Sequence, residues 1–178
     1  MKNLLVEVRA IRRCEGGYTC NLTANGTKVA FIAPDIFEWT RFTIRTDVLN
    51  WFAAKKGIKP SELKPRELKD GWESKEPDHK GDTQDDKIEA MLLEWIKLHF
   101  KAYDALQACK KSVITVGNHG ELLDWGVSPK SYRDATLQSA MIRYSAKMLN
   151  GMTIPEVVKL LEVRLNNKRS TEAVKVGG

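Results

Sequence analysis

The sequence predicts an α+β fold: a small N-terminal antiparallel β-meander packed with a C-terminal bundle of three to four helices. Two patterns lead to this prediction. Apolar and polar residues alternate at every second position near the N-terminus, and apolar residues recur at three- and four-residue steps beyond residue 84. The chain has 178 residues, which is enough for one domain or two small ones.

The alternation begins at the first predicted strand, where Leu4, Val6, Val8 and Ala10 alternate with mostly polar residues. Leu5 is the one apolar exception among the intervening positions. A strand with this period has one apolar and one polar face. We therefore expect the meander to be buried on one face and solvated on the other.

Turn residues divide the meander into three strands. The segment Ile11 to Arg13 shifts the alternation, so the first strand either ends near Ala10 or carries a bulge there. The pair Asn25-Gly26 favours a type I′ hairpin turn before a third strand over residues 28–33. Residues 36–46 fit either a helical turn or a fourth strand.

Helical signals begin at Thr46 or Asp47, either of which is a suitable N-cap, and Gly57 is a suitable stop. A longer helix is predicted from the Thr83 cap to about Lys110. Its apolar stripe consists of Ile88, Met91, Leu92, Trp95, His99, Tyr103 and Leu106.

Residues 112–116 are rich in β-branched side chains and predict a short strand or tight loop. Ser128-Pro129 predicts the start of a helix that ends at Asn150-Gly151. Leu137, Met141, Tyr144 and Met148 are expected to face inward from it. Thr153 and Glu156 form a capping box for a last helix that ends near Asn166.

These elements predict four segments. Residues 1–69 form a basic lobe of β-meander and short helices, 70–83 an acidic polar loop or linker, 84–166 a helical lobe and 167–178 a flexible tail. The charge is uneven along the chain, whose net charge is +6: residues 1–60 hold ten Lys or Arg and five Asp or Glu, whereas residues 61–90 hold six and ten. A basic lobe of this kind favours a polyanionic partner.

Composition and motifs exclude several classes of function. No run of apolar residues approaches the length of a membrane span, and charged residues interrupt the N-terminus before a signal sequence could form. The three cysteines, Cys14, Cys20 and Cys109, are unevenly spaced, which is typical of a reducing cytoplasm. We therefore expect a cytoplasmic protein that does not contact a membrane.

Catalytic and cofactor signatures are not found in the sequence. His79, His99 and His119 are too far apart in sequence for a short metal-binding motif, and no nucleophile elbow or phosphate-binding glycine motif occurs. We expect no metal or cofactor, and an enzyme ranks third among the functions considered. The loop Gly117 to Gly120 is read as a turn, with an acid–base or phosphate site as the alternative.

The strongest functional signal is a segment in which aromatic and basic residues are interleaved. Single-stranded nucleic acid binds to such surfaces because bases stack on rings while cations neutralise phosphates. The candidate nucleic-acid-binding residues are Trp39, Arg41, Phe42, Arg45, Trp51, Lys55 and Lys56. The alternative is that these aromatic residues belong to the core.

We therefore predict a non-catalytic nucleic-acid-associated accessory protein that contacts a phosphate backbone through its N-terminal lobe, with single strands favoured as the partner. The rival prediction is a protein-binding adaptor, assembly subunit or inhibitor of a larger machine. In that case the same basic residues would meet an acidic protein surface, because Trp, Tyr and Arg dominate protein interfaces.

Overall fold

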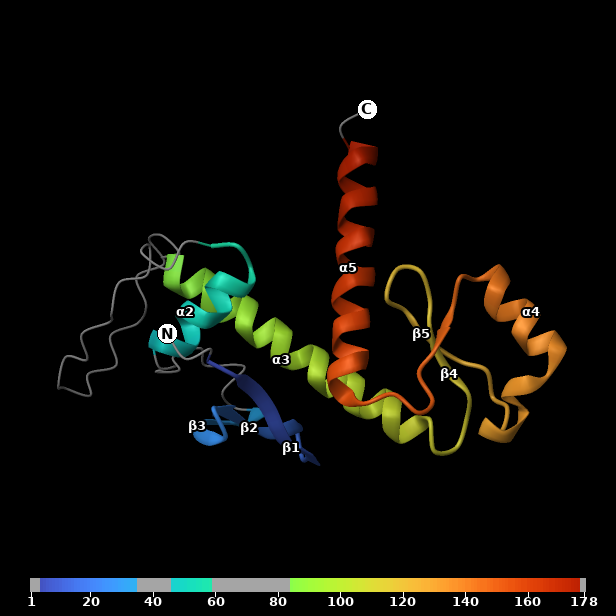
Figure 1. Cartoon of the computed structure of the whole chain (residues 1–178), viewed down its shortest axis with the longest axis horizontal. Helices are drawn as coiled ribbons and strands as arrows, with labels where there is room; N and C mark the ends of the chain where they lie inside the picture. The colour runs from blue at the N-terminus through green and yellow to red at the C-terminus, as the bar shows by residue number, and fades with distance from the viewer. Residues whose placement is uncertain (1–3, 35–45, 59–83, 177–178) are drawn as a thin grey trace. The chain divides into compact units, whose positions relative to one another are not determined.

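The structure is a computed structural model that describes residues 4–34, 46–58 and 84–176. An N-terminal sheet is followed by helices, and this confirms the predicted α+β class (Figure 1). The chain divides within one long helix into two compact units, Met1–Ile96 and Lys97–Gly178. The predicted linker, residues 70–83, lies outside the described residues, so the predicted domain boundaries remain a prediction.

The first unit contains an antiparallel sheet in the order β1-β2-β3, built from Val6–Cys14, Gly17–Ala24 and Thr27–Ile32. Cross-strand pairs place Val8, Leu22 and Ala30 side by side on one face, and Leu22 is completely buried. Asn25 and Gly26 both have positive φ, as a type I′ turn requires. One face of the meander is therefore core, as the alternation predicted.

The helix α2 (Thr46–Lys55) ends as predicted at Gly57, whose φ is +75°. The Ile58 amide donates to the Ala53 carbonyl at 2.8 Å, and the Gly57 amide donates to the Ala54 carbonyl at 3.1 Å. These two bonds form a Schellman motif, which satisfies carbonyls that the helix end would otherwise leave unpaired.

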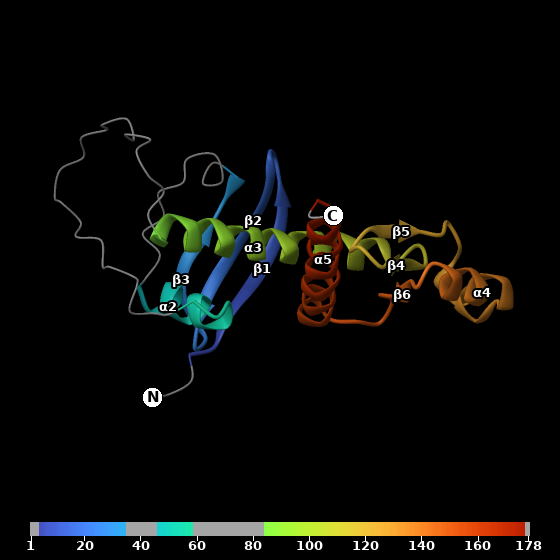
Figure 2. The same ribbon diagram turned by 90° about the horizontal axis from the view of Figure 1, so that it is seen from above.

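The long helix α3 (Gln84–Ala108) begins in the first unit. Its N-terminal part and α2 lie on the same side of the sheet (Figures 1 and 2). The Trp95 ring packs against Trp51 and Phe52, with ring centroids 5.8 and 5.9 Å apart. Trp95 is buried as expected, whereas Met91, which was placed on the same apolar stripe, is 39% exposed. Leu93 and Ile96 are buried instead, so the apolar face of α3 is wider than one stripe because this part of the helix is packed by both the sheet and α2.

The second unit contains a small antiparallel sheet in the order β5-β4-β6, made from Leu122–Asp124, Ile114–Val116 and Lys147–Met148. The predicted strand over residues 112–116 is therefore present as β4, whereas β5 and β6 were not predicted. The side chain of Asn150 stabilises the connection into β4: it accepts from the Ile114 amide at 3.0 Å and donates to the carbonyls of Cys109 and Ser112 at 3.0 and 2.9 Å.

The helix predicted from Ser128 to Asn150 was wrong in its extent. Ser128 caps only a short 3-10 helix, η2 (Pro129–Arg133), and Asp134 then caps a separate helix, α4 (Ala135–Arg143). Ser145 ends α4 because it adopts a φ of +49°, while the amide of Ala146 donates to the Met141 carbonyl at 2.8 Å. A glycine is usual at this position, and its absence hid the end of the helix.

The early end of α4 changes the surroundings of two residues that were expected to face inward. Tyr144 is 59% exposed, and Met148 lies in β6 and is half-buried. Leu137 and Met141 are buried as predicted and form a small core with Val113.

The last helix, α5 (Ile154–Val176), continues beyond its predicted end at Asn166. Its capping box is present: the Glu156 carboxylate accepts from the backbone amide and the hydroxyl of Thr153, both at 2.7 Å. Within the described ranges no helix has the length and apolar character needed to cross a membrane.

Replacement of Trp95 by alanine should lower the free energy of unfolding by about 3–5 kcal/mol, because it removes the ring that Trp51 and Phe52 contact. Urea denaturation measures this cost. Met91→Ala on the exposed side of the same helix is the control and should change stability by no more than about 0.5 kcal/mol. A cost below about 1 kcal/mol for Trp95→Ala would show that this aromatic cluster does not stabilise the unit.

The capping box should make stability depend on pH. The Thr153 amide, followed by its hydroxyl, lowers the pKa of Glu156 below its usual value of 4.5. The stabilisation is therefore present above pH 4.5 and is lost as the pH falls through the lowered pKa of the folded state. Thermal unfolding should show a larger difference between wild type and Glu156→Ala at pH 7 than near pH 3. An equal difference at both pH values would contradict this role of the carboxylate.

Candidate nucleic-acid interface

An extra residue in β1 sets the direction of two arginines. Arg9 pairs with Asn21, and Arg12 pairs with Thr19, so β1 advances by one residue more than β2 between these pairs. Ala10, within this bulge, has a φ of +52°. Residues three apart in a regular strand point to opposite faces. The bulge instead places Arg12 on the same face as Arg9.

A second bulge has the same effect on β3. Leu22 pairs with Ala30, but the next residue of β2, Thr23, pairs with Lys28, so Val29 is the extra residue. Phe31 pairs with Asn21. Lys28 and Phe31 are again three residues apart and again share a face, which their contact confirms: the Lys28 ammonium lies 4.9 Å from the centroid of the Phe31 ring.

Together the two bulges create a basic surface on the side of the sheet that α2 and α3 do not cover (Figures 1 and 2). We call this surface the open face. Pairing assigns these residues to it: Glu7, Arg9, Arg12, Thr19, Asn21, Thr23, Lys28 and Phe31. Its charged residues are three cations and one carboxylate, so its net charge is positive.

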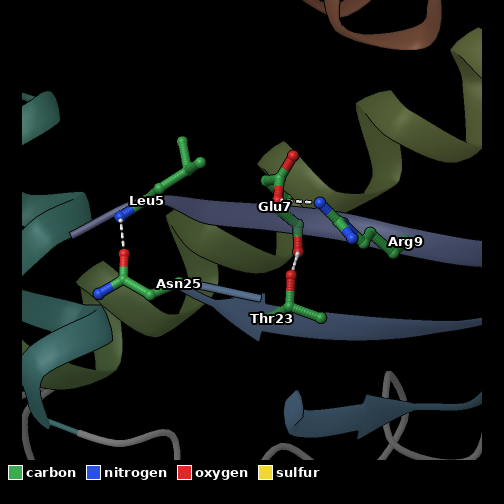
Figure 3. Close-up of polar contacts among 5 residues, drawn as sticks. All are labelled: Leu5, Glu7, Arg9, Thr23 and Asn25. Atoms are coloured by element: carbon green, nitrogen blue, oxygen red, sulfur yellow. Dashed lines mark hydrogen bonds and ion pairs between the residues drawn. The ribbon is translucent and has the colours of Figure 1, made fainter. Parts of the chain in front are cut away.

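Local hydrogen bonds order the N-terminal end of the open face (Figure 3). The Arg9 guanidinium contacts the Glu7 carboxylate at 2.7 Å, and the Thr23 hydroxyl donates to the Glu7 carbonyl at 3.3 Å. Beside them the Leu5 amide donates to the Asn25 side chain at 2.9 Å. Because the Arg9 side chain is 57% exposed, it pairs with Glu7 and still remains accessible to a ligand from solvent.

The predicted residues of α2 form a different arrangement on the other side of the sheet. Trp51 is half-buried against Trp95, and the Lys55 ammonium lies 5.7 Å from the Trp51 ring and 4.5 Å from the Trp95 ring. Lys56 lies 5.4 Å from the Phe52 ring. These cations cover the edge of an aromatic core cluster while remaining exposed to solvent.

The other predicted site residues, Trp39, Arg41, Phe42 and Arg45, lie outside the described residues. Their role remains a prediction, as does the role of Trp51, Lys55 and Lys56 in binding. Four residues of the open face become candidates for the site that the sequence alone did not single out: Arg9, Arg12, Lys28 and Phe31. The phase shift at residues 11–13 was the available signal, but it predicted a bulge without showing which side chains the bulge would bring together.

The loop Gly117 to Gly120 forms a turn between β4 and β5. The His119 amide donates to the Glu121 carboxylate at 2.9 Å, and the Gly120 carbonyl accepts from Lys101 at 3.1 Å. A Cβ at Gly117 would lie 2.0 Å from a Glu121 carboxylate oxygen, so a larger residue here would displace the Glu121 side chain from its present position. Because the His119 amide is already hydrogen-bonded to the Glu121 carboxylate, the loop is better interpreted as a turn than as a phosphate site.

In the described part of the chain, an activated thiol or a cluster of metal-binding side chains would indicate another kind of site. Burial raises the pKa of Cys20 to about 12 and also raises the pKa of Cys109, so neither thiol is activated as a nucleophile. Among the described residues no three His, Cys, Asp or Glu side chains come together as a metal site would require.

Comparison with known proteins finds no family model, curated protein or solved structure that matches the chain.

The bulge in β1 should tolerate glycine better than alanine. The left-handed conformation of Ala10 costs about 1–2 kcal/mol, which exceeds the entropy cost of a glycine, about 0.4–1 kcal/mol. Ala10→Gly should therefore raise the free energy of unfolding by roughly 0.5–1 kcal/mol, measured by chemical denaturation. Ala30→Gly in β3, where φ is not positive, is the matched control and should be destabilising. Destabilisation by Ala10→Gly would contradict the strained bulge.

Proposed function

We propose that this chain is a non-catalytic nucleic-acid-associated protein that contacts a phosphate backbone through its basic N-terminal unit. The observation that carries the proposal is the pair of bulges, one in each edge strand, that gathers Arg9, Arg12 and Lys28 on the open face. Without the bulges, neither Arg12 nor Lys28 would share that face.

The arrangement suits phosphate binding for two reasons. Guanidinium groups donate several hydrogen bonds in a planar fork that matches phosphate oxygens, and Arg9 and Arg12 both project from an edge strand. Neutralisation of phosphates also releases condensed counterions, which supplies most of the free energy of sequence-independent binding. Thr19 and Asn21, on the central strand, add neutral polar groups between the charged edges.

The predicted contacts of Trp39, Arg41, Phe42, Arg45, Trp51, Lys55 and Lys56 belong to the same proposal. They would provide a second basic and aromatic contact in the N-terminal part of the chain. Loss of Arg41 and Arg45 should lower affinity independently of loss of Arg9 and Arg12, since the two pairs would contact different phosphates.

The double variant Arg9→Gln/Arg12→Gln should bind labelled oligonucleotides more weakly. A plot of log affinity against log salt should become shallower by about one unit for each lost phosphate contact. The measurement is fluorescence anisotropy at several salt concentrations. The control, Lys110→Gln/Lys111→Gln, removes the same net charge from two exposed lysines of the second unit.

Two results would contradict this function. One is an absence of oligonucleotide binding by the wild-type protein at low salt, where electrostatic affinity is greatest. The other is an equal loss in the control variant, which would assign the binding to overall net charge rather than to the open face. Thermal unfolding of each variant confirms that it is folded.

A protein-binding adaptor is the second candidate, and an exposed apolar region of the second unit favours it. Ile142 is 78% exposed, and Tyr144 contacts the half-buried Trp125 ring at a centroid distance of 6.1 Å. Arg143 between them and Lys147 nearby are also exposed, so a partner here would carry acidic side chains around an apolar anchor. The variant Ile142→Asp tests this candidate. If it no longer captures a protein partner but binds oligonucleotides as the wild type does, the two functions belong to separate surfaces.

A further inference from the structure

We propose that the ligand of the open face is single-stranded nucleic acid, and that one of its bases stacks on the Phe31 ring in place of the Lys28 ammonium. This inference rests on the proposed function and names the class of nucleic acid and the contact that selects it.

Phe31 is an exposed aromatic residue on the open face. Its side chain is 48% exposed in an edge strand, although its neighbours on the open face are polar or charged. Its cross-strand neighbour is Asn21, which provides no apolar cover. A large ring that remains in solvent on a basic face provides a stacking platform for a base, because every base presents a π-face.

Lys28 lies over the Phe31 ring. In the free protein its ammonium lies 4.9 Å from the Phe31 centroid, so a cation covers the ring that a base would use. Exposed cation–π contacts are weaker than base–aromatic stacking. A base can therefore replace the ammonium, and the flexible lysine stem then lets the charge move to a phosphate of the same strand. Both partners of the free-state contact would gain a contact in the complex.

The order of residues across the sheet brings a basic edge and the aromatic ring into one row. Arg9, Asn21 and Phe31 are consecutive cross-strand partners, so they form one row from edge to edge. Neighbouring strands are about 4.8 Å apart, which places the ends of this row about 10 Å apart. A single-stranded nucleic acid whose phosphates lie along Arg9 and Arg12 can extend a base across Asn21 to the Phe31 ring. The Asn21 amide can both donate to and accept from a base edge.

Duplex nucleic acid cannot make the same contact. Its bases are stacked on one another, and its grooves present base edges rather than base faces to a protein. A duplex would reach the open face only through its phosphates. The Phe31 contact should therefore separate single strands from duplexes, whereas the arginine contacts should not.

The experiment uses the full chain and two probes: a labelled single-stranded oligonucleotide of mixed sequence, and the same strand annealed to its complement. Phe31→Leu removes the ring but retains an apolar side chain, and Lys28→Gln removes the charge. Met91→Leu, on the opposite side of the sheet from the open face, is the control for Phe31→Leu. We expect Phe31→Leu to weaken single-strand binding by about 5- to 100-fold with an unchanged salt slope, and to alter duplex binding little. Lys28→Gln should reduce the salt slope by about one unit.

A spectroscopic signature tests the exchange of Lys28 for a base. In the free protein the ring current of Phe31 should shift the NMR signals of the Lys28 ε-methylene protons away from their usual position. The single-stranded probe should move these signals toward the position of an ordinary lysine, while the duplex should leave them in place. In Phe31→Leu the shift should already be missing without any probe.

The outcomes separate this inference from the function on which it rests. Weakened binding by Arg9→Gln/Arg12→Gln beside unchanged single-strand binding by Phe31→Leu would overturn the stacking contact and leave the backbone contact standing. Equal losses of single-strand and duplex binding in Phe31→Leu would also overturn it. If the wild-type protein binds neither probe at low salt, the proposed function itself is wrong. Because Phe31 is exposed, its variant should unfold at the wild-type temperature, and this is measured in parallel.

Discussion

One-sided burial of the β1-β2-β3 sheet is the constraint on which the first unit depends. Among the described elements of the first unit, α2 and the N-terminal part of α3 cover one face of the sheet, the face that carries Val8, Leu22 and Ala30 (Figures 1 and 2). The completely buried Leu22 and Phe52 belong to this core. Because the alternation of side chains is fixed by the pleat, burial of one set of residues places the other set on the opposite face. The open face is thus a consequence of the core.

The bulges decide what the solvated face contains. A one-residue insertion in an edge strand leaves the central strand and its packing intact, since only the edge strand has to bend. In β1 the insertion turns Arg12 toward Arg9, and in β3 it brings Lys28 over Phe31. Charged groups along edge strands also discourage pairing with another chain. The same cations can therefore protect the sheet edge and form the proposed binding surface.

The second unit is organised by polar side chains that satisfy the backbone at sharp changes of direction. Asn150 is distant in sequence from the connection that it stabilises, and its amide makes three hydrogen bonds to backbone groups between Cys109 and Ile114. Ser112 and the Gly126 amide both donate to Asp124 in the same region, and these bonds lower the pKa of that carboxyl. Buried or half-buried backbone groups need such partners, because leaving them unpaired costs more than a hydrogen bond contributes.

Local signals in the sequence determined those features that depend on a few neighbouring residues. They include the alternating strand at Val6, the Asn25-Gly26 turn, the stop at Gly57 and the capping box at Thr153. Each follows from a preference of backbone or side chain that acts within a few positions. Burial of Trp95 was also predictable, because the apolar spacing of a long helix is a strong signal.

Tertiary structure alone decided the composition of the candidate site. The phase shift near Ala10 indicated an irregularity, but only pairing with β2 showed that Arg12 rejoins the face of Arg9, and nothing local marked Val29 as an extra residue. Ser145 likewise ended α4 without the glycine that a local rule expects. At Ala10 and Val29 the irregularity is defined by the pairing with β2, and Ser145 lies two residues before β6, which pairs with β4. These pairings join segments that are distant in the sequence, so no short window of neighbouring residues predicts which side chains share a face.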